Sequence, residues 1–552
     1  MHLSHAFCVI SLCVNLLSRV IIKDSDYDRN KTHAIQGGLF MKQEIIQRFR
    51  DDLEQFNDAT RKYYAGEIDR KTYKGISGGF GSYSERDGKR GMLRLRMTGG
   101  RMDKDKLSFV VDSANAYGID TMKMTTCETI QLHHLTAEQI VELSAKALDH
   151  GIFCRGGGGD HPRNVMAPPL SGVQPGETFD VTPHAYAGGA YLLSILYDIK
   201  MPRKLKVGFA NHPSNITHAT IRDLGFVARE DGKFDVYSAG GMGPNARLGM
   251  KMAEAVPGSE LLYYVRAMVD TFLAHGNYEM RAKARTRYMP VAMGEDAYRA
   301  AFLQNVQTRK AEGGLDLTVT ETPVTKTGAG EISGKRIVAQ KQPGLFAVSY
   351  HPLGGTPSRQ TLTALRDTIA DMEAVEIRLG ADGTMYIINC TADEAQRVLN
   401  VTADGAETLF EHSVSCIGAL ICQQGARDSQ GLYHACVDAV RKANIPDGAL
   451  PQIHISGCPS SCGTHQIGAL GFHGGVKIVD KKPLPAFTLH VGGSAVLGHE
   501  HLAENWGPML EERIPAFLVE VGQTVAAAGQ SFAEWLPAHM DDLRAIAKPY
   551  LD

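Results

Sequence analysis

The chain has 552 residues, of which 43% are hydrophobic and 22% charged, and its formal net charge is −3. This length exceeds what one hydrophobic core accommodates and predicts about three or four domains. The small net charge gives no sign of nucleic-acid or membrane-surface binding, and ten cysteines at this length do not make a disulfide scaffold.

The first 40 residues differ from the rest of the chain. An apolar run from Ala6 to Leu17 is too short to span a bilayer and lacks the basic start of a signal peptide. We therefore expect residues 1–40 to be a poorly ordered extension, such as an upstream start before Met41. A membrane anchor is the less favoured alternative.

Two elements open the chain after Met41. Apolar residues recur at helical spacing over residues 45–56, which predicts a helix. Period-two alternation then predicts a strand at residues 92–97, with Arg94 and Arg96 on one face and apolar side chains on the other.

A β-α-β-β-α unit is built around this strand. The pattern predicts a helix near residues 103–117, strands near 120–125 and 129–135, and a further helix that Thr136 caps and Gly151 ends. This order predicts a ferredoxin-like sheet with helices on one face.

Short sequence features of the first half of the chain recur later, displaced by 255 or by 246 residues. The matching pairs are Gly99-Gly100 with Gly354-Gly355, Thr136 with Thr391, and Leu224-Gly225-Phe226 with Leu470-Gly471-Phe472. Their recurrence indicates an internal duplication. The predicted elements of the second copy are a helix at residues 358–372 and strands at 375–379 and 385–389.

Four cysteines stand in two pairs, Cys416-x5-Cys422 and Cys458-x3-Cys462. Four thiolates are the ligand set of a cubane iron–sulfur cluster. Zinc also accepts four thiolates, but its usual pairs are two to four residues apart, and C-x5-C lies outside that spacing. The remaining alternative is a scatter of small buried apolar residues, because free cysteine packs well in cores.

Each copy lacks what the other contains. At the positions of Cys458 and Cys462 the first copy has His212 and Ile216, so only the second copy can hold the cluster. At the positions of Arg94 and Arg96 the second copy has Ser349 and His351. We therefore expect one site at the interface of the copies, with metal on one side and cations on the other.

The segment C-x5-C followed by Gly-Cys-Pro-x-x-Cys-Gly resembles the siroheme and iron–sulfur site of assimilatory sulfite and nitrite reductases. The resemblance implies a [4Fe-4S] cluster with four cysteine ligands, the last of which also bridges to the siroheme iron. By position these metal ligands are Cys416, Cys422, Cys458 and Cys462. The family usually has Asn after Cys-Pro, where this chain has Ser460.

Three basic segments are similar to the three active-site segments of the same family. They are Leu93-Arg94-Leu95-Arg96, Arg163-Asn164-Val165 and Pro202-Arg203-Lys204-Leu205-Lys206. The resemblance implies that four cations bind the oxyanion on the distal face of siroheme and supply protons: Arg94, Arg163, Lys204 and Lys206. It implies further cofactor contacts from Arg96, Gln131, His133, Arg203 and Arg285, besides Cys462. Singly, such residues are usually solvated surface charges, but gathered cations repel one another unless an anion neutralises them.

One segment departs from the family pattern. The family usually reads Thr-Thr-Arg-Gln or Thr-Asn-Arg-Gln, whereas this chain reads Thr125-Thr126-Cys127-Glu128. The change removes an expected partner for a siroheme carboxylate and adds an acid. Glu128 would be unfavourable beside siroheme unless it points away, and either another arginine compensates or the cofactor sits differently.

The resemblance implies a six-electron reduction, of sulfite to sulfide or of nitrite to ammonia. Sulfite reductases tend to have Lys at the position of Lys206, and nitrite reductases tend to have Asn. Lys206 therefore favours sulfite, with nitrite as the alternative. Two other classes stay open: a non-catalytic iron–sulfur redox protein and a zinc-binding structural protein.

The electrons must come from a partner, because the chain has no G-x-G-x-x-G fingerprint in a strand–turn–helix setting and no flavin module. We expect an external donor, either a ferredoxin or a separate flavoprotein. A cluster of this kind also points to a reducing cytoplasm.

These observations together predict an α+β fold with two ferredoxin-like repeats and two siroheme- and iron–sulfur-binding α/β domains. We expect the segment from Glu500 to Asp552 to be helical. The expected divisions after the extension are a helix and first repeat at 41–152, a first siroheme-binding domain at 153–308, a connector at 309–342, a second repeat at 343–405 and an iron–sulfur/siroheme domain with C-terminal helices at 406–552.

Overall fold

The computed structural model describes residues 34–35, 39–40, 43–320 and 323–552. The expectation of a poorly ordered extension at residues 1–40 falls mostly outside these residues. Within that range, β1 (Ala34–Ile35) pairs antiparallel with β2 (Leu39–Phe40). In the described part of the chain, every helix is too short or too polar to cross a membrane.

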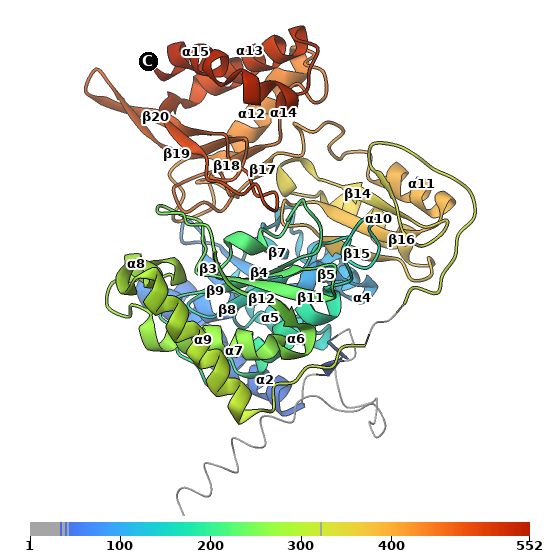
Figure 1. Ribbon diagram of the computed structural model, residues 1–552, viewed down its shortest axis with the longest axis vertical. Helices are drawn as coiled ribbons and strands as arrows, with labels where there is room; N and C mark the ends of the chain where they lie inside the picture. Colours follow the sequence, from blue (N-terminus) through green and yellow to red (C-terminus); the bar gives the residue numbers. More distant parts are fainter. Residues whose placement is uncertain (1–33, 36–38, 41–42, 321–322) are drawn as a thin grey trace, which may run out of the picture.

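The first repeat is an antiparallel four-stranded sheet covered by helices, as predicted (Figure 1). Its strands, in spatial order, are β3 (Ser82–Ser84), β4 (Gly91–Arg96), β7 (Thr129–Leu135) and β6 (Met122–Met124). Its helices are α2 (Gln43–Tyr64), α3 (Arg70–Ser77), α4 (Lys104–Tyr117) and α5 (Ala137–Asp149). The predicted cap is confirmed: the Thr136 hydroxyl accepts from Gln139 N, which satisfies a free amide of the first turn.

The second repeat has the same plan, with one strand added at one edge. Its sheet runs β13 (Ile337–Ala339), β14 (Phe346–Tyr350), β16 (Met385–Cys390), β15 (Glu376–Leu379) and β5 (Arg101–Met102), and the last strand comes from the first repeat. Its helices are α10 (Arg359–Ile369) and α11 (Ala392–Val401). The two repeats share one hydrophobic core, so they form a single packed unit.

Strand register confirms the duplication. Leu93 faces Leu132 across β4 and β7, and residues 255 positions later, Val348 and Ile387, face each other across β14 and β16. The same offset relates the pair Met122 and Leu132 to the pair Ile377 and Ile387. A one-residue slip would turn every side chain to the opposite face, so matching register means that both copies bury equivalent positions.

Two mixed sheets complete the molecule, and they are copies of each other. The first, in spatial order, is β12 (Met250–Pro257), β11 (Lys233–Ser238), β10 (Leu224–Ala228), β9 (Leu205–Ala210) and β8 (Pro162–Met166). The second is β17 (Val414–Ser415), β18 (Ile453–Ser456), β19 (Leu470–Val479), β20 (Lys482–Val491) and β21 (Glu504–Leu510). Their parallel central pairs match at an offset of 246, since Leu224 faces Val207 and Leu470 faces Ile453.

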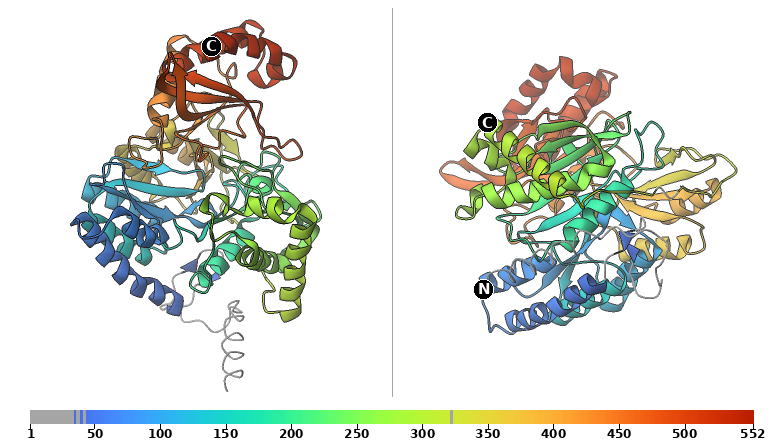
Figure 2. Two further views of the ribbon diagram at one scale, coloured as in Figure 1. Left: turned by 90° about the vertical axis from the view of Figure 1, so that its left-hand side faces the viewer. Right: turned by 60° about the horizontal axis from the view of Figure 1, so that its bottom comes forward.

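Helices cover both mixed sheets (Figures 1 and 2). The first sheet has α6 (Thr182–Ser194), α7 (Leu261–His275), α8 (Met289–Met293) and α9 (Glu295–Glu312). The second has α12 (Ser429–Lys442), α13 (Ile514–Ala527), α14 (Phe532–Trp535) and α15 (Met540–Leu551). The prediction that the chain is helical throughout from Glu500 was wrong: β21 precedes α13, α14 and α15. Gly507 and Pro508 are poor helix formers, and pairing with β20 satisfies the backbone there.

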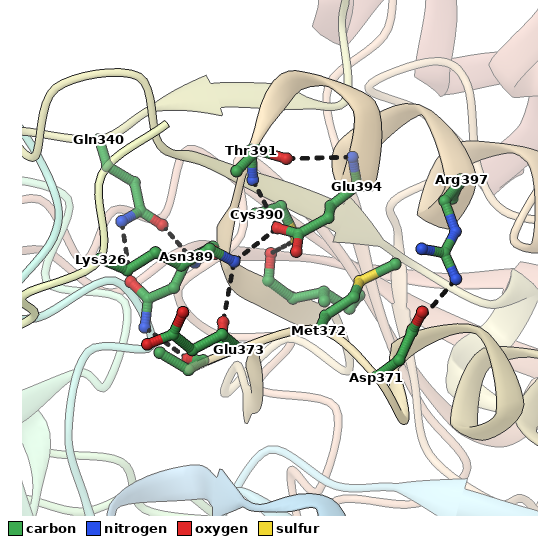
Figure 3. A network of polar contacts seen from close by, with 12 residues as sticks. Lys326, Gln340, Asp371, Met372, Glu373, Asn389, Cys390, Thr391, Glu394 and Arg397 are labelled. Carbon is green, nitrogen blue, oxygen red and sulfur yellow. Dashed lines mark hydrogen bonds and ion pairs between the residues drawn. The ribbon is translucent and has the colours of Figure 1, made fainter. Parts of the chain in front are cut away.

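The predicted connector at 309–342 is shorter than expected and packs closely against the second repeat. Helix α9 extends to Glu312, and β13 adds an edge strand. Figure 3 shows Lys326 reaching into the second repeat, where its Nζ donates to Asn389 O (2.9 Å) and to the Glu394 carboxylate (2.5 Å). Gln340 forms two hydrogen bonds with Asn389, so the segment is held by side chains rather than by its own regular structure.

Candidate active site at the interface of the two copies

Neighbouring strands of the first copy bring the four predicted catalytic cations together. Arg163 lies on β8, Lys206 lies on β9, and these strands pair in parallel. From β4, Arg94 Nη1 donates to Gly157 O at 2.6 Å, and Arg163 Nη1 donates to the same oxygen at 3.0 Å. One backbone carbonyl therefore fixes the two guanidinium groups side by side.

These four cations have no carboxylate partner. Among the described residues, Arg94, Arg163, Lys204 and Lys206 form no ion pair, whereas nearby Arg203 pairs with Asp160 (3.1 Å) and Arg285 with Asp223 (3.0 Å). Burial, together with the like charges of Arg285, Lys206 and Arg163, lowers the pKa of Lys204 well below its ordinary value. The site thus holds uncompensated positive charge, which fits an anionic ligand.

The four predicted metal ligands converge from the second copy. Each cysteine is a free thiol. The pKa of Cys422 is raised by burial and by the neighbouring Cys462 and Cys458 thiols. The pKa of Cys462 is raised by burial and by Cys416 and Cys458. These thiols lie near enough to affect one another, and a metal cluster that displaces their protons would remove the repulsion.

The two sets meet at one interface. Lys204 and Lys206 lie near enough to Cys462 to oppose the rise of its pKa. Thr126, which follows β6, donates from its hydroxyl to Cys462 O at 2.9 Å. The structure therefore brings the cations and the thiols together. We expected this because the first copy has the cations without the cysteines, and the second copy has the cysteines without the arginines.

This donor set fits an iron–sulfur cluster beside an anionic macrocycle. Four thiols are present without a disulfide among them. Arg163, Arg285 and Arg287 each bury an Nε atom that has no hydrogen-bond partner. Unpaired buried donors are costly, and carboxylates of a bound cofactor would satisfy such groups.

The residues expected to contact the cofactor lie at different distances from the four cations. Gln131 lies directly opposite Arg94 across β4 and β7, and Arg285 lowers the pKa of Lys204, so both are near the cations. Arg203 lies at the edge, paired with Asp160. The other two have scaffold contacts, and the cofactor role of all five residues stays a prediction.

The scaffold contacts of those two residues are well defined. Arg96 is buried and donates to Arg155 O (3.0 Å) and Arg163 O (3.1 Å). His133 shares the Glu85 carboxylate with His134, at 3.1 and 2.9 Å. Arg96 therefore supports the loop that orients Arg163.

The structure shows the surroundings of Cys127 and Glu128, the two residues that differ from the family pattern. Glu128 is fully buried, its Oε2 accepts from Ala167 N at 3.1 Å, and Arg222 is near enough to oppose the rise of its pKa. Burial raises its pKa well above the ordinary value, which favours the neutral acid. For Cys127, burial would raise the pKa of the thiol, but Lys206 and Arg222 outweigh it and lower the pKa to about 6.

Sequence reasoning missed three residues of the site. Arg222 is buried beside Cys127 and donates to Thr126 O at 3.3 Å. Tyr83 accepts from Gly159 N at 2.8 Å, close to Arg163. Lys123 on β6 donates to Gly354 O and lies near Cys416; burial lowers its pKa to about 8. The available signal for Lys123 was a lysine between two methionines in a strand expected to be buried.

Comparison with known proteins agrees with this geometry. Residues 83–150 match the family model for the nitrite/sulfite reductase ferredoxin-like half domain, and residues 158–310 match that for the nitrite and sulphite reductase 4Fe-4S domain. Over these residues the chain is similar to the nitrite and sulfite reductase family. Both matches fall on the first copy, whereas the four cysteines lie in the second.

The similar proteins include enzymes named for each substrate. Sulfite reductase (ferredoxin) 1 of Mycolicibacterium paratuberculosis is 22% identical over 82% of this chain and 83% of its own. The assimilatory ferredoxin-dependent nitrite reductase of Haloferax mediterranei is 24% identical over 84% and 85%. The structure of the Mycobacterium tuberculosis NirA protein shares the fold, with a TM-score of 0.74 at 21% identity, over 91% of this chain and 97% of that one. Reductases of this family carry siroheme and a [4Fe-4S] cluster.

Proposed function

We propose that this reductase converts sulfite to sulfide with six electrons. Cys416, Cys422, Cys458 and Cys462 would hold the [4Fe-4S] cluster, with Cys462 bridging to siroheme. When bound, siroheme and the cluster supply the iron for oxyanion binding and the route for electrons. The observation that supports this proposal is the placement of Lys204 and Lys206 beside Cys462, with no carboxylate partner for either lysine among the described residues.

Residues of the first copy would bind the oxyanion and deliver protons. Arg94 and Arg163 supply fixed cationic donors, because Gly157 O holds both side chains. The lowered pKa of Lys204 makes its ammonium group a ready proton donor as substrate oxygens leave as water. Reduction of sulfite releases three oxygens as water and therefore consumes about two protons for each one.

Nitrite reduction to ammonia by the same site is the second candidate, because relatives with both activities match at similar identity. Lys206 favours sulfite. A second lysine adds attraction and protons for the larger, doubly charged anion. A non-catalytic iron–sulfur protein is the third candidate, and the retention of all four unpaired cations weighs against it.

The electron donor would be external. Relatives of both kinds are named as ferredoxin-dependent, which favours a ferredoxin over a separate flavoprotein. The free thiols of the cluster site are compatible with our expectation of a reducing cytoplasm.

The test is turnover of the anaerobically purified holoenzyme from cells that make siroheme. Iron, acid-labile sulfide and siroheme are measured first, because zinc in place of iron would favour a structural protein. Oxidation of reduced viologen with sulfite and with nitrite then gives kcat/KM for each. A preference for sulfite supports the proposal, a preference for nitrite overturns the substrate assignment, and no turnover with both cofactors present overturns the enzymatic role.

A further inference from the structure

A group of three histidines lies behind the loop that carries Cys458 and Cys462. His473 is on β19, His490 is on β20, and His465 is in the loop that leads to β19. One ring nitrogen of each lies within 4.8 Å of the others. The three ring centroids are 4.8 to 5.0 Å apart, so the rings form a nearly regular triangle.

Local structure brings these rings together. Across β19 and β20, His490 faces Gly471 and His473 faces Thr488, so the two histidines are diagonal neighbours on one face of the pair. Gly471 lets the third one approach, because a Cβ at that position would lie 1.9 Å from His465 O.

The hydrogen bonds of the three histidines leave ring nitrogens free to bind a metal ion. His473 Nδ1 and His490 Nε2 are 2.8 Å apart, so the two nitrogens share one proton. His465 Nδ1 lies 3.0 Å from Ser456 Oγ, and that oxygen also accepts from Gly463 N at 3.0 Å. If Nδ1 of His465 donates to this serine, its Nε2 carries the free lone pair, as in many metal-ligating histidines.

The tautomer of His490 is compatible with ligation through Nε2. His490 is 6% exposed, and its Nδ1, which has no hydrogen-bond partner among the described residues, can carry the ring proton while Nε2 faces His473. Burial also lowers the pKa of His465, His473 and His490, to about 2 for His465 and about 4 for His490. All three rings are therefore neutral at pH 7, which is the state that ligates metals.

The duplication provides an internal comparison. The positions of the first copy equivalent to His465 and His473 are Ala219 and Val227, at the offset of 246. Strand pairing aligns His490, which faces Gly471, with Tyr237, which faces Gly225. The first copy thus has the same backbone and no histidine at any of the three positions.

We propose that His465, His473 and His490 bind a divalent transition-metal ion of the zinc class. Three neutral imidazoles with no thiolate or carboxylate in the set suit Zn²⁺, Cu²⁺ or Ni²⁺ rather than Mg²⁺ or Ca²⁺. The ion replaces the proton shared by His473 and His490. Half-buried His473 gives access from solvent.

The ion would connect the cluster loop to the sheet. His465 is three residues beyond Cys462, and His473 faces Ser456, which lies two residues before Cys458. Binding would therefore join the loop between Cys458 and His465 to β19 and β20. This role is separate from the proposed reaction and does not depend on the substrate.

The experiment uses the holoenzyme equilibrated with one equivalent of Zn²⁺ and then desalted. Zinc is counted by elemental analysis, and its ligands are identified by zinc K-edge X-ray absorption. We expect about one zinc per chain with a nitrogen shell at about 2.0–2.1 Å. A shell at about 2.3 Å would reveal sulfur from the cluster cysteines and overturn the proposal.

The variant His473→Val introduces the residue found in the first copy, and His490→Gln is a second variant in case the first fails to fold. Each should weaken zinc binding by about 100-fold or more, since loss of a ligand exceeds the effect of losing an outer-shell partner. The control is exposed His499→Ala in the same domain. Unchanged zinc binding in the folded variants, or no zinc retained by the parent protein, would show a hydrogen-bonded histidine core instead.

Discussion

Lys206 lies against the thiol of Cys127, and with Arg222 it lowers the pKa of that thiol to about 6 although burial alone would raise it. The residue on which our proposal of sulfite rests thus has an ionisable neighbour at the position where the family usually has arginine. At neutral pH Cys127 is a thiolate, so it neutralises part of the charge that would attract the substrate.

We expect Lys206→Asn to lower kcat/KM for sulfite by about 100-fold and for nitrite by less than about 10-fold, because a cationic proton donor is lost where the larger dianion needs it most. Steady-state assays with reduced viologen measure both values. Lys206→Arg is the matched control, since it keeps the charge and should retain the substrate ratio. Equal losses for both substrates in Lys206→Asn would contradict the discriminating role.

The thiolate of Cys127 predicts a pH dependence. Below a pKa of about 6 the thiol is neutral, the site gains net positive charge, and KM for the oxyanion should fall. Cys127→Ser removes this titration. KM is measured from pH 5 to 8 for both proteins, so that ionisation of the substrate is common to both and cancels. Parallel profiles would show that Cys127 does not titrate in this range.

Buried Glu128 predicts a pH-dependent cost in stability. Its pKa is raised in the folded state, so unfolding releases a proton, and stability falls as pH rises from the unfolded pKa toward the folded one. Glu128→Gln removes this loss, which grows by about 1.4 kcal/mol per pH unit between the two values. Thermal unfolding should therefore show a larger gain in Tm at pH 8 than at pH 5. Exposed Glu67→Gln is the control, and equal gains at both pH values would argue against a buried neutral acid.

Lys326 predicts that the connector stabilises the second repeat. Its side chain is 7% exposed and pairs with Glu394, so Lys326→Met should cost about 3 kcal/mol by leaving a buried acceptor uncompensated. The control is Lys335→Met, which breaks an exposed pair with Asp447 and should cost less than about 1 kcal/mol. Thermal unfolding of both variants measures the difference. Similar small losses would mean that the network in Figure 3 is not needed for stability.

Elements of the fold could be predicted where a short stretch of sequence carries the signal. The alternation at residues 92–97 became β4, the cap at Thr136 formed as expected, and the offset of 255 reappeared in strand register. The helical expectation for the segment after Glu500 failed at β21, because pairing with β20 is a non-local contact that composition does not encode.

The sequence by itself determined which residue types are available for the proposed site: four cysteines in one copy, four cations in the other, and a duplication that places them in equivalent halves. Only the tertiary structure decided which charges stay unpaired, that Glu128 turns into the core, and that Lys123 reaches Gly354 beside Cys416. It also gathered His465, His473 and His490 from a loop and two strands. Residue types fix what a side chain can bind or titrate, but pairing and burial depend on contacts between segments that lie far apart in the chain.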